Sequence, residues 1–504
     1  MAGMSYTFQD SRGVNAGLNG PDPLKGYAPN FLYISQDNGS GVKSIGGGTP
    51  NQATQISYFG RLTYTYDNRY SIQANFRADA FDSSKLSKKS RWGYFPSVSA
   101  GWTISNEPWM AGVKDALNMD FLKFRASWGV NGNIAVLSGY KYSSTIDYNS
   151  TEYQYNPDDR EVTHGSVPSG QPNPDLKWET SKQLDLGLDA RFFQNRLTIG
   201  VDYFDKRTEG LLVNISPILE SGIASSTVNA GSVKNSGIEL EAGWQDNIGD
   251  FSYGINANFS TLKNLVTYLE PTVGRQEGAR FSNFWSGPSF EEGHSVWYMR
   301  ALNFAGVDHE TGRPLFYNKD GEKVGTDVIS TNDLTDMGST IPTYNYGITI
   351  NMAWKGFDMI IFGTGAGGNV LMPCIYRVEH PRINSLKYFY ENAWTPSNKD
   401  AKMPSVESTW NQVSFWSSSA NIFKGDFFKI KQIQLGYTLP QSLTKKVAID
   451  NLRIYTSLDD FFLFSKYPGF DPETNSTGAY NGGGLDKGNY PNAKRLVFGV
   501  NVTF

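Results

Sequence analysis

The sequence predicts an all-β protein, a transmembrane antiparallel β-barrel, and three features predict it. Segments in which apolar and polar side chains alternate recur along most of the 504 residues, as strands between lipid and a wet lumen require. Short polar connections alternate with long ones, which is typical of an outer-membrane barrel. Charged residues make up 19% of the chain and aromatic residues 14%, with 52 glycines, a composition that suits aromatic girdles and tight turns.

Composition argues against several other classes of protein. The mean hydropathy is −0.42, and no apolar stretch approaches the roughly 18 residues that a membrane helix needs. A net charge of −4 without a long basic run argues against nucleic acid as a partner. The single cysteine, Cys374, rules out an internal disulfide. The first residues, MAGMSYTFQDSRG, lack the basic and apolar regions of a signal peptide.

Four hairpins are predicted within residues 55–81, 184–203, 238–259 and 346–361, with turns near residues 67, 194, 246 and 355. Two alternating runs joined by a tight polar turn form such a unit. In the second hairpin, one face of the first strand carries Leu184, Leu186, Leu188, Ala190 and Phe192, and the other carries Asp185, Gly187, Asp189 and Arg191. In the third, the charged residues Glu239 and Glu241 share a face, which must therefore be wet.

Two more strands are predicted near the C-terminus. The segment 428–439 slips phase, with Phe428 and Ile430 on one face and with Ile433, Leu435, Tyr437 and Leu439 on the other. Either a strand that projects beyond the lipid or a β-bulge explains this slip. The last residues alternate strictly, and one face carries Leu496, Phe498, Val500, Val502 and Phe504.

Connection lengths predict the topology. Short connections are expected near residues 67, 105–119, 194, 246, 355 and 440–450, and long ones near 131–175, 209–232, 306–341, 370–425 and 465–495. Short periplasmic turns and long extracellular loops give this arrangement, whereas structureless loops of such length count against a soluble sandwich. Counting strands between the connections gives about 15, or about 16 if MSYTFQDSR is one.

Seven segments in order along the chain carry a family resemblance. They are LKFRASWGVNGN (122–133), NPDLKWETSKQLDLGLD (173–189), VKNSGIELEAGW (233–244), FAGVDHETGRPLFYNKDGE (304–322), GDFFKIKQIQLGYTLP (425–440), NLRIYTSLDDFFLFSKYPGFDPE (451–473) and GLDKGNYPNAKRLVFGVNVTF (484–504). Together they resemble the SusC/RagA family of TonB-dependent outer-membrane transporters. The resemblance covers nearly the whole chain.

The resemblance implies a barrel of about 22 strands with a plugged lumen, in the outer membrane of Bacteroidetes-type bacteria. It also implies a SusD-like surface lipoprotein that closes over the substrate, and energy supplied through TonB. On this pattern, residues 1–54 are an extracellular loop and part of a barrel strand, and 55–504 are the C-terminal barrel region. Plug and TonB box are not visible, so we expect the C-terminal portion of a longer transporter and an incompletely closed arc of strands.

The resemblance also gives a role to the last strand. A terminal aromatic residue matches the signal that the barrel-assembly machinery recognises in outer-membrane proteins. The residues expected to carry this signal are Phe498, Val500, Val502 and Phe504.

No catalytic residue, metal site or cofactor site is predicted. Gly363, Gly365 and Gly368 fit G-x-G-x-x-G, but no helix cap or βαβ unit follows, so glycines at the start of a loop are the better interpretation. The histidines are scattered, without the close spacing of zinc ligands: they are His164, His294, His309 and His380. Acidic pairs satisfy the count that a glycosidase needs, but acidic residues at alternate strand positions indicate a polar lumen.

Substrate contacts, if the family's function carries over, come from lumen-facing and loop residues. Aromatic side chains suit sugar faces or peptide side chains, and each of them has packing in a girdle or loop as its alternative role. The candidates are Trp285, Trp297, Tyr298, Trp394, Trp410 and Trp416. The expected substrate is an oligosaccharide or a peptide, with outer-membrane lipid around the barrel. The alternative function is a passive pore or surface protein derived from a truncated transporter, and a soluble all-β protein is a distant third.

Overall fold

The computed structural model describes residues 1–19, 42–47, 51–82, 84–137, 139–153, 163–168, 170–215, 220, 226–374, 386–406, 412–473, 483–488 and 492–504. For residues 14–19, 42–47, 51, 147–153 and 163–164 it describes the backbone alone.

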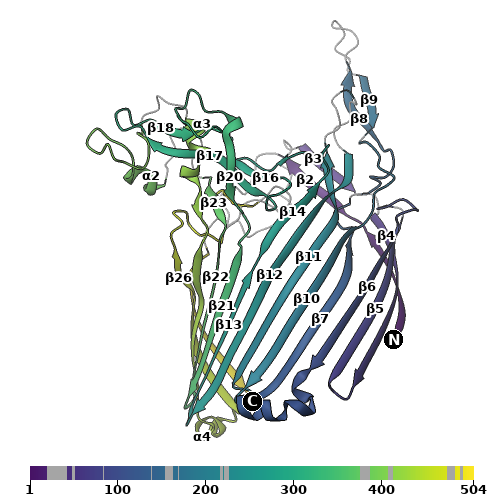
Figure 1. Ribbon diagram of the computed structural model, residues 1–504, viewed down its shortest axis with the longest axis vertical. Helices are drawn as coiled ribbons and strands as arrows, with labels where there is room; N and C mark the ends of the chain where they lie inside the picture. Colours follow the sequence, from purple (N-terminus) through teal and green to yellow (C-terminus); the bar gives the residue numbers. More distant parts are fainter. Residues whose placement is uncertain are drawn as a thin grey trace.

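The main body is one antiparallel sheet of 15 strands that curves around a central space (Figure 1). In sheet order its strands are β1 (Ala2–Ser11), β4 (Asn51–Tyr66), β5 (Tyr70–Phe81), β6 (Trp92–Thr103), β7 (Met119–Asn133), β10 (Glu179–Phe192), β11 (Leu197–Ile215), β12 (Ser226–Ile248), β13 (Phe251–Thr261), β21 (Tyr344–Trp354), β22 (Phe357–Gly367), β25 (Phe427–Thr438), β26 (Asn451–Ser465) and β28 (Arg495–Thr503), with β14 (Lys263–Leu269) beside this path on β12. The all-β class and the expected strand number are confirmed.

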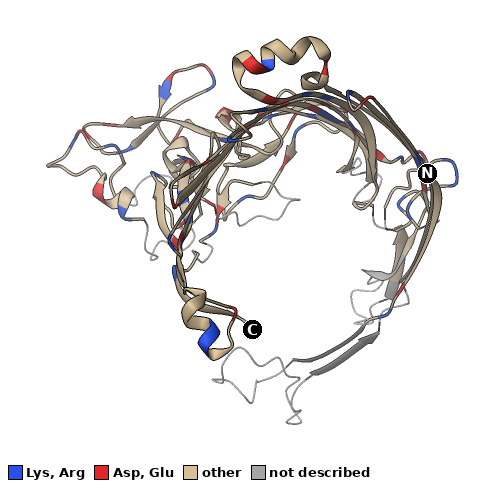
Figure 2. Ribbon diagram, turned by 90° about the horizontal axis from the view of Figure 1, so that it is seen from below, with Lys and Arg blue, Asp and Glu red and all other residues tan. Residues whose placement is uncertain are grey.

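Over the residues that the structure describes, this sheet does not close on itself. Its order begins with β1, which pairs with β4, and ends with β28, which pairs with β26. Viewed along the central space, the strands form an open arc (Figure 2). The described residues therefore form the expected incomplete barrel wall.

Short connections join the strands at one end of the sheet, called here the turn end. Asp67 and Asn68 link β4 to β5 with φ of 49° and 50°, the left-handed conformation that a type I′ turn requires at both positions. Lys355 and Gly356 link β21 to β22, also with positive φ. The hairpins predicted to turn near 67, 194 and 355 are confirmed. The turn predicted near 246 lies instead at residues 249–250, because β12 continues to Ile248.

Two connections at the turn end contain helices. Between β6 and β7 lie η1 (Ile104–Asn106), η2 (Pro108–Met110) and α1 (Ala111–Leu117), and between β25 and β26 lie α4 (Gln441–Thr444) and η6 (Lys445–Val447). None of the helices in the described ranges is long and apolar enough to cross a membrane.

The long connections meet at the opposite end of the sheet, called here the loop end, where three of them fold into one platform (Figure 1). Its elements are β15 (Gln276–Glu277), β16 (Gly287–Phe290), β17 (Tyr298–Val307), β18 (Pro314–Tyr317), β19 (Lys323–Val324), η4 (Thr331–Asp333), β20 (Leu334–Gly338), β23 (Val370–Pro373), α2 (Lys387–Glu391), α3 (Gln412–Trp416), η5 (Ser419–Asn421), β24 (Phe423–Lys424) and β27 (Leu485–Asp486). Met299, Met372, Phe415 and Leu485, which come from the three connections, share one buried core. Two hairpins stand apart, β2 (Val14–Asn19) with β3 (Val42–Gly47) and β8 (Ile146–Tyr153) with β9 (Thr163–Pro168).

The segment 209–232, predicted as a long loop, is mostly strand. β11 extends to Ile215 and β12 starts at Ser226, so the two remain paired far beyond the span of a membrane. The ladder shifts at Gly210, whose φ is 67°. Glycine, serine and asparagine suggested a loop, but beyond lipid both faces of a strand can be polar while the backbone pairing continues.

Side chains alternate between an outer and an inner face of the wall. Leu240 of β12 lies between its partners Val201 and Phe259 on the outer face, and all three are exposed. Aromatic rings gather on this face at both ends of the strands. Those at the turn end are Tyr70, Trp102, Trp244, Trp354, Phe357 and Tyr437, and those at the loop end are Tyr58, Trp92, Tyr94, Tyr346, Phe428 and Phe464. Two such belts flank the apolar band of a membrane barrel.

The phase slip in 428–439 is a β-bulge. Gly363 of β22 pairs with Ile430 of β25, and the adjacent Phe362 pairs with Gln432, which leaves Lys431 as an extra residue. The bulge at Lys431 therefore changes which parity of residue faces outward. Of the two explanations for the slip, the bulge is correct.

Of the three glycines that fit G-x-G-x-x-G, Gly363 and Gly365 lie inside strand β22 and not at the start of a loop. A Cβ on Gly363 would lie 2.6 Å from the Phe428 ring, and one on Gly365 would lie 2.3 Å from the Tyr346 ring. These glycines therefore leave room for two stacked rings, whose centroids are 5.9 Å apart. Only Gly368, with φ 76° after the strand, fits the interpretation from sequence.

The two faces differ in what they tolerate. We predict that Leu240→Lys destabilises the folded chain by about 2 kcal/mol in a bilayer, because the charge enters the lipid-facing band. The adjacent Glu241→Lys, on the inner face, should change stability by less than about 0.5 kcal/mol. Urea titration in phospholipid bilayers, followed by the fraction of protein with folded electrophoretic mobility, measures both. Equal destabilisation by the two variants would contradict the assignment of the faces.

Candidate binding surface

The inner face of the wall is polar, and its charged side chains form ion pairs across strands. Arg125 of β7 donates two hydrogen bonds to Asp189 of β10, at 2.7 and 2.9 Å, and its Nη2 lies 3.0 Å from Asp202 of β11. Gly187 gives this cluster its space, because a Cβ there would lie 2.2 Å from Asp202 Oδ1. The wall is thus hydrophilic, with charges balanced locally.

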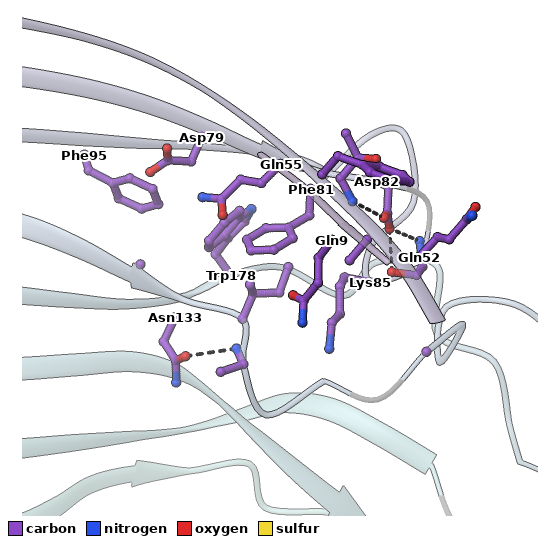
Figure 3. A pocket seen from close by; sticks show the side chains of 18 of the residues that line it. Gln9, Gln52, Gln55, Asp79, Phe81, Asp82, Lys85, Phe95, Asn133 and Trp178 are labelled. Carbon is purple, nitrogen blue, oxygen red and sulfur yellow. Dashed lines mark hydrogen bonds between the residues drawn. The ribbon is translucent and has the colours of Figure 1, made fainter. Parts of the chain in front are cut away.

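A cavity of about 1360 Å³ lies on the inner face at the loop end of β1, β4, β5, β6 and β7 (Figure 3). Its lining combines aromatic rings, amide groups and charged groups. Among the lining residues are Gln9, Gln52, Gln55, Arg77, Asp79, Phe81, Asp82, Lys85, Phe95, Asn133 and Trp178. This mixture suits a polar ligand that also has apolar faces.

Three rings form the apolar part of the cavity. Trp178 packs edge-on against Phe95, with ring centroids 5.4 Å apart, and lies 5.8 Å from Phe81. Two glycines on neighbouring strands leave room for them. A Cβ on Gly93 would lie 2.4 Å from the Phe95 ring, and one on Gly132 would lie 2.2 Å from it and 3.0 Å from Trp178. The indole Nε1 of Trp178 donates to the Arg91 carbonyl at 3.2 Å, which fixes the orientation of the ring.

The charged groups of the cavity are paired with neighbours. Arg77 Nε donates to both carboxylate oxygens of Asp79 at 2.8 Å, and its Nη2 donates to Ser57 Oγ at 3.0 Å. Asp82, beyond the end of β5, accepts from Thr54 N at 2.7 Å and Ser84 N at 2.8 Å. Burial raises the pKa of Asp82, but hydrogen bonds from Ser84 and Thr54 outweigh it and hold that pKa below its ordinary value. A ligand therefore meets charged groups that hydrogen bonds already hold in place.

A second cluster clamps the connection after β26 onto the wall. Lys429 of β25 is 2% exposed and donates to Asp471 at 2.6 Å and to Glu473. Lys431, at the bulge, donates to both oxygens of Glu473 at 2.8 and 2.7 Å. Two lysines of the wall therefore hold two carboxylates of a long connection at the loop end.

The aromatic residues predicted as substrate contacts lie outside the cavity, apart from Trp410, which falls outside the described residues. Trp416 lies in the platform core, 4.7 Å from Phe389, and Trp285 packs against the same core. Trp297 packs on Phe290 in a second cluster. The structure therefore brings Trp285 and Trp416 together and separates both from Trp297.

Two further candidates are fixed by hydrogen bonds. Tyr298 is 2% exposed, stacks on His294 and donates to Glu291 at 2.5 Å. Burial and this carboxylate raise the pKa of Tyr298, so its hydroxyl keeps its proton. Trp394 donates to the His309 carbonyl at 3.1 Å. A role of these residues in substrate binding stays a prediction.

The residues of the predicted assembly signal lie on the last strand and just after it. Val500 and Phe498 are 59% and 76% exposed and Phe504 is 85% exposed. Phe498 and Val500 pair with Thr456 and Ile454 of β26 on the outer face. Their role in assembly stays a prediction.

Sequence reasoning missed the rings of the cavity. Phe81 and Phe95 belong to strands whose other inward residues are polar or glycine, and Trp178 lies between a long connection and β10. A usable signal existed in Gly93 and Gly132, because strand glycines often mark the close approach of another group. Their pairing across strands could not be read from one sequence. Throughout the described part of the chain, no group of three or more His, Cys, Asp or Glu residues is placed to hold a metal ion.

Comparisons with known proteins agree on one family. Residues 2–354 match the family model described as TonB dependent receptor-like, beta-barrel. TonB-dependent receptor P3 of Formosa agariphila is 29% identical over an alignment that covers 100% of this chain and 50% of that protein. TonB-dependent receptor SusC of Bacteroides thetaiotaomicron is 28% identical, over 90% of this chain and 44% of SusC. The chain thus spans about half the length of the curated relatives it matches.

A likeness among solved structures supports the fold. The structure of the RagAB peptide transporter superposes with a TM-score of 0.79 at 23% identity, covering 100% of this chain and 53% of that one. At this identity the match concerns the fold alone.

The lysine clamp makes a testable contribution to the loop end. We predict that Lys429→Met costs about 3 kcal/mol of local stability, because removing one partner leaves a buried carboxylate without its main counter-charge. Hydrogen exchange and limited proteolysis of residues 466–473 measure the opening of this connection.

A matched variant on the same wall is Lys182→Met, which removes the exposed ion pair with Glu209 (2.6 Å). Exposed pairs contribute about 0–1 kcal/mol, so this variant should leave exchange at 466–473 unchanged. Equal protection in the Lys429→Met variant and the unmodified chain would refute the clamp.

Proposed function

The chain belongs to the TonB-dependent receptor-like β-barrel family and lies in the bacterial outer membrane, and we propose that it forms the barrel region of a SusC-like importer of glycans or peptides. The observation that carries this proposal is the two-faced wall. One continuous sheet has an apolar outer face with aromatic belts and an inner face of balanced charges. Such a wall separates lipid from a polar path for a solute.

The cavity at the loop end is the proposed substrate contact. In this class of barrel the long loops are extracellular, so the cavity lies where a solute would enter. The rings of Phe81, Phe95 and Trp178 offer apolar faces, and the amides of Gln9 and Gln55 offer hydrogen bonds beside them (Figure 3). Sugars and peptides both present this combination of surfaces. The RagAB structure is that of a peptide transporter, and SusC is a TonB-dependent receptor, so the proposal keeps both substrate classes.

The partners of the whole protein are part of the same proposal. Because the chain spans about half of its relatives' length, we place the plug and the contact with TonB in a part of the full protein beyond these 504 residues. The platform at the loop end supplies a broad surface for a SusD-like lipoprotein. We propose further substrate contacts, made directly or through the surfaces that the residues support, for Trp285, Trp297, Tyr298, Trp394, Trp410 and Trp416. The last strand, with Phe498, Val500, Val502 and Phe504, is proposed to engage the barrel-assembly machinery. The role proposed is transport, without catalysis.

Uptake by cells tests the proposal. In cells that express the full protein, Phe95→Ala with Trp178→Ala should weaken uptake of a labelled oligosaccharide or peptide. Each ring contributes about 1 kcal/mol to such contacts, so the apparent affinity should fall about tenfold or more. A protonophore, which removes the energy that reaches TonB, should abolish uptake by the unmodified protein.

The matched control is Phe362→Ala, which removes another inward-facing ring, on β22 outside the cavity. It should leave the apparent affinity within about twofold of the unmodified value, because it removes no ring of the cavity. Uptake that persists with the protonophore would indicate a passive pore. Co-purification from detergent-solubilised outer membranes should recover a SusD-like lipoprotein, and its absence would remove that partner.

A further inference from the structure

The connection between β6 and β7 carries apolar side chains that the described chain covers only in part. Trp109, Val113 and Leu117 are spaced four residues apart and are 61%, 41% and 52% exposed. No residue of α1 is buried. A helix of seven residues is marginal in water, so this one needs a medium that covers its apolar side chains.

This helix lies where lipid would be. It is the blue coil at the lower end of the wall between β6 and β7 (Figure 1), and it lies outside the ring of strands (Figure 2). The other side of the wall is the lumen, so the helix projects away from the transport path. Because it belongs to the turn end, it lies at the periplasmic surface of the outer membrane.

Glu107 joins this connection to the aromatic belt of the outer face. Its carboxylate accepts from Tyr70 OH at 2.5 Å, from Trp102 Nε1 at 3.0 Å and from Arg69 Nη1 at 3.0 Å. The rings of Tyr70 and Trp102 are stacked 6.4 Å apart. Their polar tips thus point to Glu107, two residues before Trp109, while their apolar bodies stay on the lipid-facing wall. The helix is therefore a direct continuation of the lipid-facing surface.

An apolar groove lies on the same patch of the wall. It has a volume of about 250 Å³ and is lined by Tyr64, Tyr70, Ile72, Ala100, Trp102 and Phe124. The small side chain of Ala100, between the large rings, opens the groove. Tyr70 and Trp102 line the groove and also hold Glu107, so groove and helix form one unit.

From these contacts we infer that the β6–β7 connection is a phospholipid-binding device. Trp109, Val113 and Leu117 insert into the interface of the periplasmic leaflet, and one acyl chain occupies the groove beside Ala100. Helix α1 has one positive residue, Lys114, and one negative residue, Asp115, so it has no net charge. Apolar contact, and not attraction to charged headgroups, therefore drives the binding. The inference goes beyond transport: the device anchors this side of the wall at a fixed depth.

Spin labelling of the full protein in native outer-membrane vesicles tests the helix. A nitroxide on Val113→Cys, in a Cys374→Ser background, should be accessible to dissolved oxygen and shielded from a water-soluble nickel complex. Its depth should be about 5–10 Å below the headgroups, as for interfacial helices. Strong quenching by the nickel complex would overturn the inference, and so would shielding from both reagents, which would indicate a protein partner.

Two labels on the same background separate this inference from the fold. Leu240→Cys, on the outer face of the wall, should be accessible to oxygen, and Val328→Cys, 67% exposed at the loop end, should be accessible to the nickel complex. If the Leu240→Cys label is not in lipid, the membrane placement itself fails. If only the Val113→Cys label is outside lipid, the anchor alone is wrong.

The groove is tested with a photoactivatable phospholipid. A diazirine on the acyl chain should label the tryptic peptides around Tyr64, Tyr70 and Trp102. Ala100→Phe fills the groove and should reduce that labelling severalfold. Ala242→Phe, at an outward position of β12 away from the groove, should not reduce it. Undiminished labelling in the Ala100→Phe variant would show that no chain occupies the groove.

Discussion

The need to pair every backbone polar group inside lipid governs this structure. Hydrocarbon offers no water to an unpaired N–H or C=O group, so each strand of the wall must lie between two others. One antiparallel sheet of 15 strands meets this need over its whole interior. The same pairing continues at the loop end, where β11 and β12 stay paired to Ile215 and Ser226. The paired strands therefore extend beyond the membrane and form a rigid base to which the long connections of the platform are attached.

Backbone pairing places no demand on the side chains, so the outer and inner faces of the sheet can differ. On both faces, glycine lets a large side chain lie flat against a neighbouring strand. On the outer face Gly363 and Gly365 seat Phe428 and Tyr346. On the inner face Gly93 and Gly132 seat Phe95 and Trp178, and Gly187 makes room for the ion cluster of Arg125. Glycine weakens a strand, because it has no side chain to pack and loses more conformational entropy on folding. Its repeated use where a ring or a guanidinium lies on the backbone therefore indicates that the position of that group is important. The cavity proposed for substrate and the aromatic belts are built in the same way.

The sequence predicted what depends on local alternation and on turn chemistry. Period-two patterns identified the hairpins around residues 67, 194 and 355, and the order of short and long connections gave the two ends of the wall. Prediction from the sequence failed where a strand leaves the membrane and both of its faces meet water. Residues 209–215 and 226–232 lose their alternation beyond lipid, although their backbones stay paired. The cavity was not predictable either, because Phe81, Phe95 and Trp178 meet only through the register of β5, β6, β7 and β10. Register depends on distant strands, and no single segment contains it.

The β-bulge at Lys431 shows how one residue reconciles two environments. With strict alternation through β25, the residues sharing the inward parity of Lys429 would be Ile433, Leu435 and Tyr437, whose apolar side chains belong in lipid. The extra residue reverses the parity, so these three face outward toward the turn end while Lys429 still faces inward at the loop end. The inward lysine can then bind Asp471, and the bulged Lys431 can bind Glu473. The irregularity that obscured the pattern in the sequence is thus what attaches the last long connection to the wall without placing an apolar row in the lumen.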